Sequence, residues 1–520
     1  MAALPNEIWH QIIANFEEYI PLKTWRMYGS HLVRDAPEDL RALSLVCRQF
    51  RRIAQPLLYR TIIAGRREED KLGQALAVRT LTENPQLGEL ARIVSVDEVD
   101  QHQWEMDSVL GGTTMRDIIV PALKYLDIPP ALKTRLRVPL YFDGFAALGI
   151  AFMPQLQLVD CTIDDVRSPL PWMLSGTLGL EDEILRVPKN QYADYYDDEE
   201  EEEEEEEHHH QGEDDTNKMK LQNIPKSSYA NYGFPNLTEV RIRTVGGPEG
   251  ITPAWVIEPL LLHPTLKTLR ALGTDWFDVE LKNLKWPVSR SNIEHLDLTE
   301  SIIDAEGLKH ILIRCPSLKG LSIELASCRR EMFGDYEGWD VDLDDIGDIL
   351  RQFGKGLEAF DLYTPQYNRA HCTEGRLGSL QELGSLRHLK ANKKELLGPQ
   401  VQDLYGDIGD YRALRLSEAL PPSLETLYLH WDGHYFDPKW YGRKRARVNE
   451  EVQGLILENK HPNLREIRVE RRLNTKDKHK EWPVESNVEG WEVDVVDEMV
   501  REDEEDYGSI LTFLILKKCL

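Results

Sequence analysis

Two stretches of the sequence contain residue types that bind metal ions, but both lack something that a metal site needs. The imidazoles of His208 to His210 directly follow a run of acidic residues. A resident metal needs ligands held in fixed geometry, and the surrounding sequence is too polar to fold around one. The alternating aspartates of residues 340–344 begin like a calcium loop, yet Asp345 stands where that loop needs glycine and Arg351 where it needs glutamate. We therefore expect no bound metal.

Motifs for nucleophilic, zinc-protease or dinucleotide chemistry are absent from the sequence, which holds no GxSxG, HExxH or GxGxxG. The FGKG of residues 353–356 lacks the following Ser or Thr, and the upstream glycine spacing, of a phosphate-binding loop. Cys47 lies among apolar residues at helical spacing, which indicates a packed thiol. These absences predict a non-catalytic chain without a cofactor. An unrecognised enzyme, which would need a convergent polar pocket with perturbed pKa values, stays as an alternative.

A segment rich in aromatic and basic side chains, WDGHYFDPKWYGRKRAR, occupies residues 431–447. Aromatic residues and arginine are frequent anchors in binding interfaces, and they also stack on nucleic acid. The alternative is a partly packed loop whose basic residues are solvated or pair with the chain's own acids. The composition alone leaves both interpretations open.

The overall charge restricts the partners of this chain. Its formal net charge is −28 over 520 residues, and eleven of the acidic residues form the run Asp197 to Glu207. An acidic protein repels phosphate backbones, so we expect no nucleic-acid partner and favour a partner with a basic surface. The segment 189–232 that contains the acidic run is too polar to offset its chain entropy, which predicts a disordered insertion.

The cysteines and the apolar runs indicate where the chain resides. Six cysteines are spread along the sequence without CxxC spacing, as is typical of reduced intracellular thiols. The first residues lack the basic and apolar regions of a signal peptide, and no apolar run approaches the ~20 residues of a membrane span. We expect a cytoplasmic and/or nuclear protein without a membrane partner.

Short amphipathic helices are predicted for the first 60 residues. Pro5 suits the first turn of a helix that places Ile8, Ile12 and Phe16 on one face. An inserted loop over residues 17–38 precedes a second helix, which starts at the N-cap candidate Asp39. Pro56 either ends this helix or starts the next turn. Such short helices carry more apolar surface than they can bury among themselves. The surplus must be covered either by the rest of the chain, as a cap on the next domain, or by a partner.

This segment resembles the F-box motif in its fungal form. The resemblance rests on the LPxEI start, the LxLVCRxFRRIA middle and the PLLY end, which occur in the order of that family, with the loop inserted between the first two parts. It implies that the helices dock on an adaptor of the SKP family, which binds a cullin scaffold. The adaptor-binding residues that the resemblance implies are Leu4, Pro5, Ile8, Ile12, Leu43, Val46, Cys47, Phe50, Leu57 and Tyr59.

A second pattern, LxxLxL after a Pro, Gly or Ser turn, recurs from about residue 150. Each copy predicts a strand with alternate apolar residues facing a core. The first apolar residues of successive copies from Leu237 onward are separated by 29, 27, 25, 39, 29, 38 and 40 residues. Helix-like stretches between the copies begin at Asp304, Asp345 and Asn449, and the apolar end SILTFLILKKCL predicts a buried last strand. The first residues of the nine copies are Leu156, Leu237, Leu266, Ile293, Leu318, Leu357, Leu386, Leu424 and Leu464.

This recurrence resembles the leucine-rich repeats that follow many F-boxes. It implies an α/β fold in which a helical F-box precedes an irregular solenoid, with parallel strands on the concave face and helices on the convex face. Target contacts are then expected between the buried positions of the strands and in the aromatic segment. The candidates are Arg241, Arg243, Asp297, Thr299, Glu324, Asp361, Tyr363, Tyr428, His430, Trp440 and Arg468.

The expected domains are an F-box at 1–62, a helical linker with first irregular repeats at 63–149, and a repeat domain at 150–520 interrupted by the acidic insertion. Together the two resemblances imply the substrate-recognition subunit of a cullin-RING ubiquitin ligase. It would act by holding an unknown target protein near the charged conjugating enzyme. The alternative is a repeat scaffold whose N-terminal helices only cap the solenoid.

Overall fold

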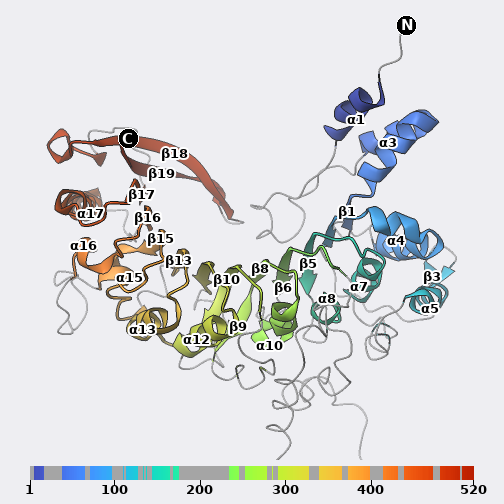
Figure 1. The fold of residues 1–520 in the computed structure, drawn as a ribbon, viewed down its shortest axis with the longest axis horizontal. Coiled ribbons are helices and arrows are strands. Elements are labelled where there is room, and N and C mark those ends of the chain that lie inside the picture. The colour runs from blue at the N-terminus through green and yellow to red at the C-terminus, as the bar shows by residue number, and fades with distance from the viewer. Residues whose placement is uncertain are drawn as a thin grey trace, which may run out of the picture. The chain divides into compact units, whose positions relative to one another are not determined.

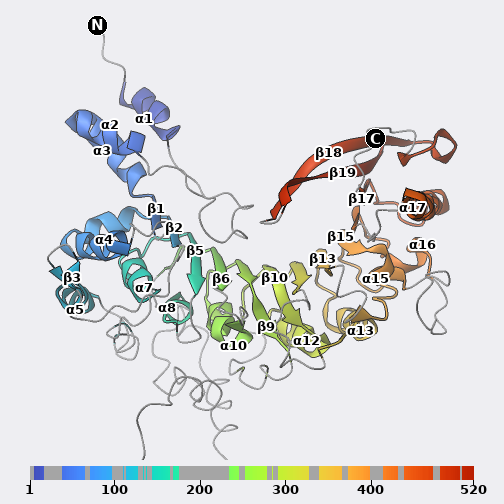
Figure 2. The ribbon, with the colours of Figure 1, turned by 180° about the vertical axis from the view of Figure 1, so that it is seen from behind.

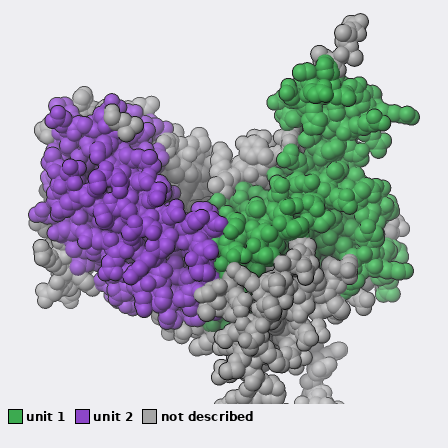
Figure 3. Space-filling view, in the orientation of Figure 1, with its two compact units in different colours: residues 1–275, 279–293 green, residues 276–278, 294–520 purple. Residues whose placement is uncertain are grey.

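Two compact units make up the chain (Figure 3): unit 1 comprises residues 1–275 and 279–293, and unit 2 comprises residues 276–278 and 294–520. The structure is a computed structural model. Residues 17–37 of the predicted loop and the acidic insertion at 189–232 lie outside its described residues, whereas Glu38, the last residue of the predicted loop, begins a helix. The described residues are 5–16, 38–64, 71–96, 109–110, 113–126, 133, 136, 143–163, 168–174, 234–244, 252–277, 281, 284, 291–326, 339–365, 373–398, 414–430, 438–471, 481–503 and 506–519.

Three helices open unit 1: α1 (Asn6–Ala14), α2 (Glu38–Val46) and α3 (Arg48–Leu58). The prediction of one continuous second helix is wrong, because Cys47 adopts an extended backbone between α2 and α3. Its Sγ accepts a hydrogen bond of 3.4 Å from the Phe50 N–H and so caps α3. Asp39 lies inside the first turn of α2 and does not cap it.

Pro56 does not end the helix that contains it, so the first of the two alternatives for this residue is wrong. It lies inside α3, whose last helical residue is Leu58. A proline this close to a helix end removes one backbone hydrogen bond and leaves the following residues free to complete the turn.

A parallel sheet follows the helices in unit 1. It pairs β1 with β2, β2 with β5, β5 with β6, and β6 with β8. Figure 1 shows helices α4, α7 and α8 along one side of these strands. The strands of unit 1, inside and outside this sheet, are β1 (Thr61–Ala64), β2 (Ile93–Val96), β3 (Val109–Leu110), β4 (Thr113–Thr114), β5 (Leu158–Ile163), β6 (Glu239–Thr244), β7 (Thr252–Pro253) and β8 (Thr268–Leu272), with β9 (Thr274–Trp276) at the boundary of the units. β3 pairs antiparallel with β4, and β7 pairs with β9. The helices are α4 (Lys71–Glu83), η4 (Pro85–Leu90), α5 (Met115–Tyr125), α7 (Asp143–Ala151), α8 (Leu170–Leu174), α10 (Ala254–Ile257) and η7 (Glu258–Leu262).

Unit 2 contains a second run of parallel strands, which an antiparallel hairpin closes (Figure 2). The hairpin strand β19 pairs antiparallel with both β17 and β18. The strands are β10 (His295–Ile303), β11 (Gly320–Leu325), β12 (Val341–Asp342), β13 (Ala359–Tyr363), β14 (Thr373–Glu374), β15 (His388–Asn392), β16 (Thr426–His430), β17 (Glu466–Arg471), β18 (Trp491–Asp503) and β19 (Asp506–Lys518). The helices are α12 (Ala305–Arg314), α13 (Leu343–Phe353), α15 (Lys393–Leu397), α16 (Leu416–Ala419), α17 (Pro438–Glu458) and η9 (Val484–Ser486).

All nine LxxLxL copies coincide with parallel strands, as predicted. Their apolar positions lie in register with one another, so that Leu389 pairs with Leu427 and Leu427 with Ile467. Every one of these positions is buried. The register holds because a strand turns alternate side chains to one face, and a slip by one residue would expose the whole apolar set. The helical N-terminus and a large, mostly parallel sheet thus make this a mixed α/β fold.

The helix predictions between the strands fare unevenly. Asp304 caps α12 by accepting a hydrogen bond of 2.7 Å from the Gly307 N–H, as predicted. α13 is capped by Asp342 and not by Asp345. Asn449 does not begin a helix, because it lies within the long helix α17 that starts at Pro438. The predicted last strand is β19, whose residues from Thr512 to Leu516 are buried.

A buried histidine at the end of η7 gives unit 1 a testable dependence on pH. His263 is 1% exposed, and burial lowers its pKa from 6.5 to about 4. Its Nδ1 accepts a hydrogen bond of 3.3 Å from the Thr265 N–H, and within the described residues its Nε2 has no hydrogen-bond partner. The folded protein therefore holds this ring neutral between about pH 6.5 and pH 4, whereas the unfolded chain protonates it.

We expect the His263→Gln variant to flatten the acid limb of the stability profile. Because the unfolded state binds the extra proton, the free energy of unfolding falls as pH drops below 6.5, by about 1.4 kcal/mol per unit from this group. Denaturant titrations at pH 7 and pH 5 measure the difference, which should be about 2 kcal/mol smaller in the variant. An unchanged difference would contradict a neutral buried ring.

Candidate adaptor-binding and target-binding surfaces

The three N-terminal helices build a small core of their own. The core cluster of Ile13, Leu40, Ile53, Ala54 and Leu57 combines one residue from α1, one from α2 and three from α3. Side chains around it are partly buried, and the rings of Trp9 and Phe50 lie 4.7 Å apart. α1 is thus attached to α3 by an aromatic contact and by the buried Ile13.

Apolar side chains also line the outside of this helical segment. The predicted stripe of Ile8 and Ile12 on α1 and Phe16 just after it is exposed, because α1 turns Trp9 and Ile13 toward α3 instead. At the end of α2, Leu45 is 80% exposed and Val46 is 65% exposed. Isolated exposed apolar residues are common on soluble proteins, but five on and directly after two short helices, α1 and α2, form an unusual concentration.

In unit 1 the polar side of the sheet contains buried charges. Asp160 of β5 forms ion pairs with Arg243, through Oδ1 and Nη1, and with Arg241, at 3.8 Å, both on β6. Both arginines are buried, and Arg241 also donates to Glu239 at 2.8 Å. A buried guanidinium is stable only with such partners, so these arginines serve the fold of the sheet.

In unit 2 the side of the strands opposite the buried apolar positions carries a histidine between two carboxylates. His430 of β16 lies with Nε2 3.4 Å from Asp361 Oδ1 and Nδ1 3.4 Å from Glu470 Oε2. Burial opposes protonation of this ring, but the hydrogen bonds to the two carboxylates outweigh it and raise the pKa of His430. The His430 ring lies 5.2 Å from the Tyr363 ring and 4.8 Å from that of Tyr428.

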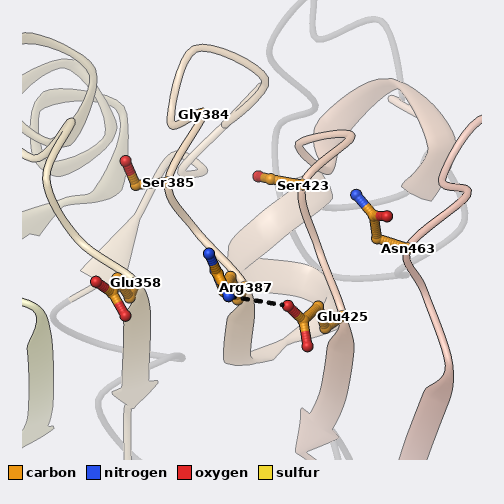
Figure 4. Close-up of a pocket in the computed structure, with 7 residues that line it drawn as sticks. All are labelled: Glu358, Gly384, Ser385, Arg387, Ser423, Glu425 and Asn463. Atoms are coloured by element: carbon orange, nitrogen blue, oxygen red, sulfur yellow. Dashed lines mark hydrogen bonds and ion pairs between the residues drawn. The ribbon is translucent and has the colours of Figure 1, made fainter.

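A shallow hollow of about 430 Å³ opens at the turns that precede the strands of unit 2 (Figure 4). Arg387 and Glu425 point toward each other across it, with Nη1 and Oε1 3.4 Å apart. The Ser423 hydroxyl donates to the Leu386 carbonyl at 2.8 Å, and the Asn463 amide donates to the Pro422 carbonyl at 3.4 Å. These polar groups stabilise the turns, and we assign the hollow no chemistry.

Two further properties concern only the residues that the structure describes. No three His, Cys, Asp or Glu side chains among them come together to hold a metal ion, and the His208 to His210 triplet lies outside them. No described helix combines the length and the apolar composition needed to cross a bilayer.

Comparison with known proteins identifies the N-terminal part. Residues 1–64 match the family described as F-box-like. This part of the chain is an F-box-like domain. The match supports the prediction of an F-box at the N-terminus. No curated protein matches the chain.

The predicted adaptor-binding residues of the F-box-like domain differ in how exposed their side chains are. Pro5, Ile8, Ile12, Val46 and Cys47 are exposed, whereas Leu43, Phe50 and Tyr59 are partly buried. The prediction is corrected for Leu57: this side chain is 7% exposed, belongs to the domain's own core and is not free for a partner. Leu4 lies outside the described residues.

Sequence reasoning overlooked Leu45, the most exposed large apolar side chain among the described residues of the F-box-like domain. Its signal was available, because Leu45 is apolar yet falls outside the helical stripe formed by Leu43, Val46 and Phe50. An apolar residue on the polar side of α2, such as Leu45, is a candidate for contact with a partner protein.

The predicted target-binding residues also divide. The prediction of target contacts is corrected for Arg241, Arg243 and Thr299, because these residues are buried. Trp440 lies on α17, but its side chain is outside the described ones. The remaining candidates are partly exposed on the strands of unit 2: Asp297, Glu324, Asp361, Tyr363, Tyr428, His430 and Arg468.

Proposed function

We propose that this protein is a non-catalytic substrate receptor of an SCF-type cullin-RING ubiquitin ligase. In this proposal the F-box-like domain binds the SKP-family adaptor, and the sheet-forming remainder is a leucine-rich-repeat solenoid that binds a target protein. The complex would raise the concentration of a target lysine near the ubiquitin thioester. We also propose that the F-box is of the fungal type and that the adaptor connects the chain to a cullin scaffold.

The observation that carries this proposal is the exposed apolar surface on a domain of this family. The F-box-like match supplies the class of partner. Exposed Ile8, Ile12, Phe16, Leu45 and Val46 supply the surface that such a partner would cover. Burial of each large apolar side chain contributes about 1.5–3 kcal/mol, from which the cost of association is subtracted.

The repeat assignment is supported by the nine in-register strands of the two units. Each LxxLxL copy buries its three apolar positions against neighbouring copies, as a repeat must when it cannot bury them alone. The hairpin of β18 and β19 covers the free edge of β17 at the end of this array. Covering the last repeat in this way is the role of a terminal cap.

The scaffold alternative, in which the N-terminal helices only cap the solenoid, makes a different physical claim. It requires their apolar surface to be covered by the chain itself. Among the residues that the structure describes, the core cluster of these helices contains only their own side chains, and Leu45 and Val46 are exposed. This arrangement favours an external partner over a cap.

Exposed anchors allow a test that leaves folding intact. We expect Leu45→Glu and Val46→Glu to weaken adaptor binding by about 30-fold each, because a carboxylate would be buried in the interface. Leu457→Glu and Val484→Glu are matched controls, because these residues are similarly exposed at 64% and 62% but lie in unit 2. The measurement is calorimetric titration of each purified full-length chain with purified SKP-family adaptor.

The proposal predicts that the controls bind as the wild type does. Equal binding by all four variants would contradict an interface at the end of α2. No binding by the wild-type chain would overturn the assignment to an SCF complex.

A further inference from the structure

A second surface, on the strands of unit 2, has a composition that selects a partner. It lies on the side of β10, β11, β13, β15, β16 and β17 opposite the buried apolar positions, and we call it the acidic face. Cross-strand register aligns Asp297 with Ser322, Asp361 and Lys390. It continues the same row through Tyr428 and Arg468.

Carboxylates outnumber cations on the acidic face. Its five acids stand against two permanent cations, Lys390 and Arg468, and three histidines, His295, His388 and His430. The face therefore stays negative when His430 is charged and the other two histidines are neutral, so it repels acidic proteins and nucleic acid and attracts a basic partner. The five acids are Asp297, Glu324, Asp361, Glu466 and Glu470.

The middle of the acidic face combines hydrogen-bonded charges with aromatic rings. Asp361 receives a hydrogen bond of 3.0 Å from Lys390 Nζ and lies 3.4 Å from His430, and its side chain is still 25% exposed. A carboxylate offers about four lone-pair sites, so these two contacts leave room for a donor from outside. The partly exposed rings of Tyr363 and Tyr428 flank His430 beside the carboxylate. Lys390 Nζ lies 5.8 Å from the centroid of the Tyr428 ring, so this ring already has a cation beside it.

We propose that the acidic face of unit 2 docks an arginine-bearing segment of a target protein, with a guanidinium stacked beside Tyr363 or Tyr428 and hydrogen-bonded to Asp361. Arginine fits better than lysine, because its planar guanidinium stacks on aromatic rings and binds a carboxylate through two parallel hydrogen bonds. This inference rests on the proposed function in naming the docked protein as a ubiquitination target.

A labelled peptide of alternating arginine and serine is the probe, measured by fluorescence anisotropy on the full-length chain. The double variant Asp361→Asn/Glu470→Gln should bind it about tenfold more weakly than the wild type. The control Asp348→Asn/Glu382→Gln removes the same charge from exposed acids off this face, so the attraction to the rest of the acidic chain is matched. It should change binding by less than about twofold.

A second variant removes a positive charge from the acidic face, so its expected gain in binding cannot be explained by misfolding. Lys390 is 52% exposed, so Lys390→Gln should leave the fold unchanged and bind the peptide about threefold more tightly. Lys355→Gln, on an exposed residue after α13, is its control and should bind as the wild type does. Equal effects of face and control variants would overturn the proposal, as would tight binding of the matching glutamate-serine peptide.

Adaptor binding, measured on the same samples, separates this inference from the proposed function. Loss of the peptide effect with adaptor binding retained overturns the acidic face and leaves the ligase assignment standing. A peptide effect in a chain that does not bind the adaptor supports the docking face and removes the ubiquitination role.

Discussion

Replacing Asp160 with alanine is expected to lower the free energy of unfolding of unit 1 by about 3–5 kcal/mol. The carboxylate of Asp160 is buried and forms ion pairs with both Arg241 and Arg243. Its removal leaves two buried guanidinium groups on β6 without this negative charge. The desolvation cost of those groups then counts fully against the folded state.

Hydrogen exchange at the amides of β5 and β6 measures this effect, because it reports the opening of unit 1 even if unit 2 unfolds separately. Glu239→Ala is the control: this carboxylate contacts Arg241 and Arg270 but is partly exposed, so its loss should cost at most about 1 kcal/mol. Adding Arg243→Leu to Asp160→Ala should recover part of the stability. Equal losses for the two single variants would refute a special role for the buried pair.

Glu481→Ala should destabilise unit 2 to a similar extent, about 3–5 kcal/mol. Glu481 is fully buried and lies 3.2 Å from Arg471 at the end of β17 and 3.1 Å from Arg445 on α17. Asn449 of α17 donates to the Glu481 backbone carbonyl at 2.7 Å and accepts a hydrogen bond of 2.6 Å from Arg471. The carboxylate thus links α17 to the last parallel strand.

Glu425→Ala provides the comparison for Glu481. Glu425 also pairs with two arginines, Arg387 and Arg465, but at the surface, where its loss should cost at most about 1 kcal/mol. Denaturant unfolding followed through hydrogen exchange of β16 and β17 distinguishes the two variants. A Glu481 variant as stable as the Glu425 variant would show that α17 does not depend on the buried carboxylate.

The strands could be located from the sequence because their signal is local. In Leu424, Leu427 and Leu429, as in the eight other copies, spacing alone specifies which side chains share a face. The turn residue before each copy marks where the strand begins. Asp304 was identified as a cap for the same reason, since its partner Gly307 lies three residues away.

The N-terminal helices show where local reasoning fails. The stripe of Ile8, Ile12 and Phe16 was recognised, but helical spacing does not state whether a stripe faces the domain's core or its exterior. Packing of Trp9 against Phe50 turns the stripe outward. The break at Cys47 was missed because its cap uses a thiol, which is not among the usual capping groups.

The sequence by itself determined the order of the elements, the buried positions of the strands and the F-box-like character of the first helices. Only the tertiary structure decided which polar residues are available to a partner. Arg241 and Tyr428 hold equivalent positions between strand anchors, yet one is buried beside Asp160 and the other lies on the acidic face. The reason is physical: the free energy of a charge depends on burial and on neighbours from distant parts of the chain, which spacing along one strand does not contain.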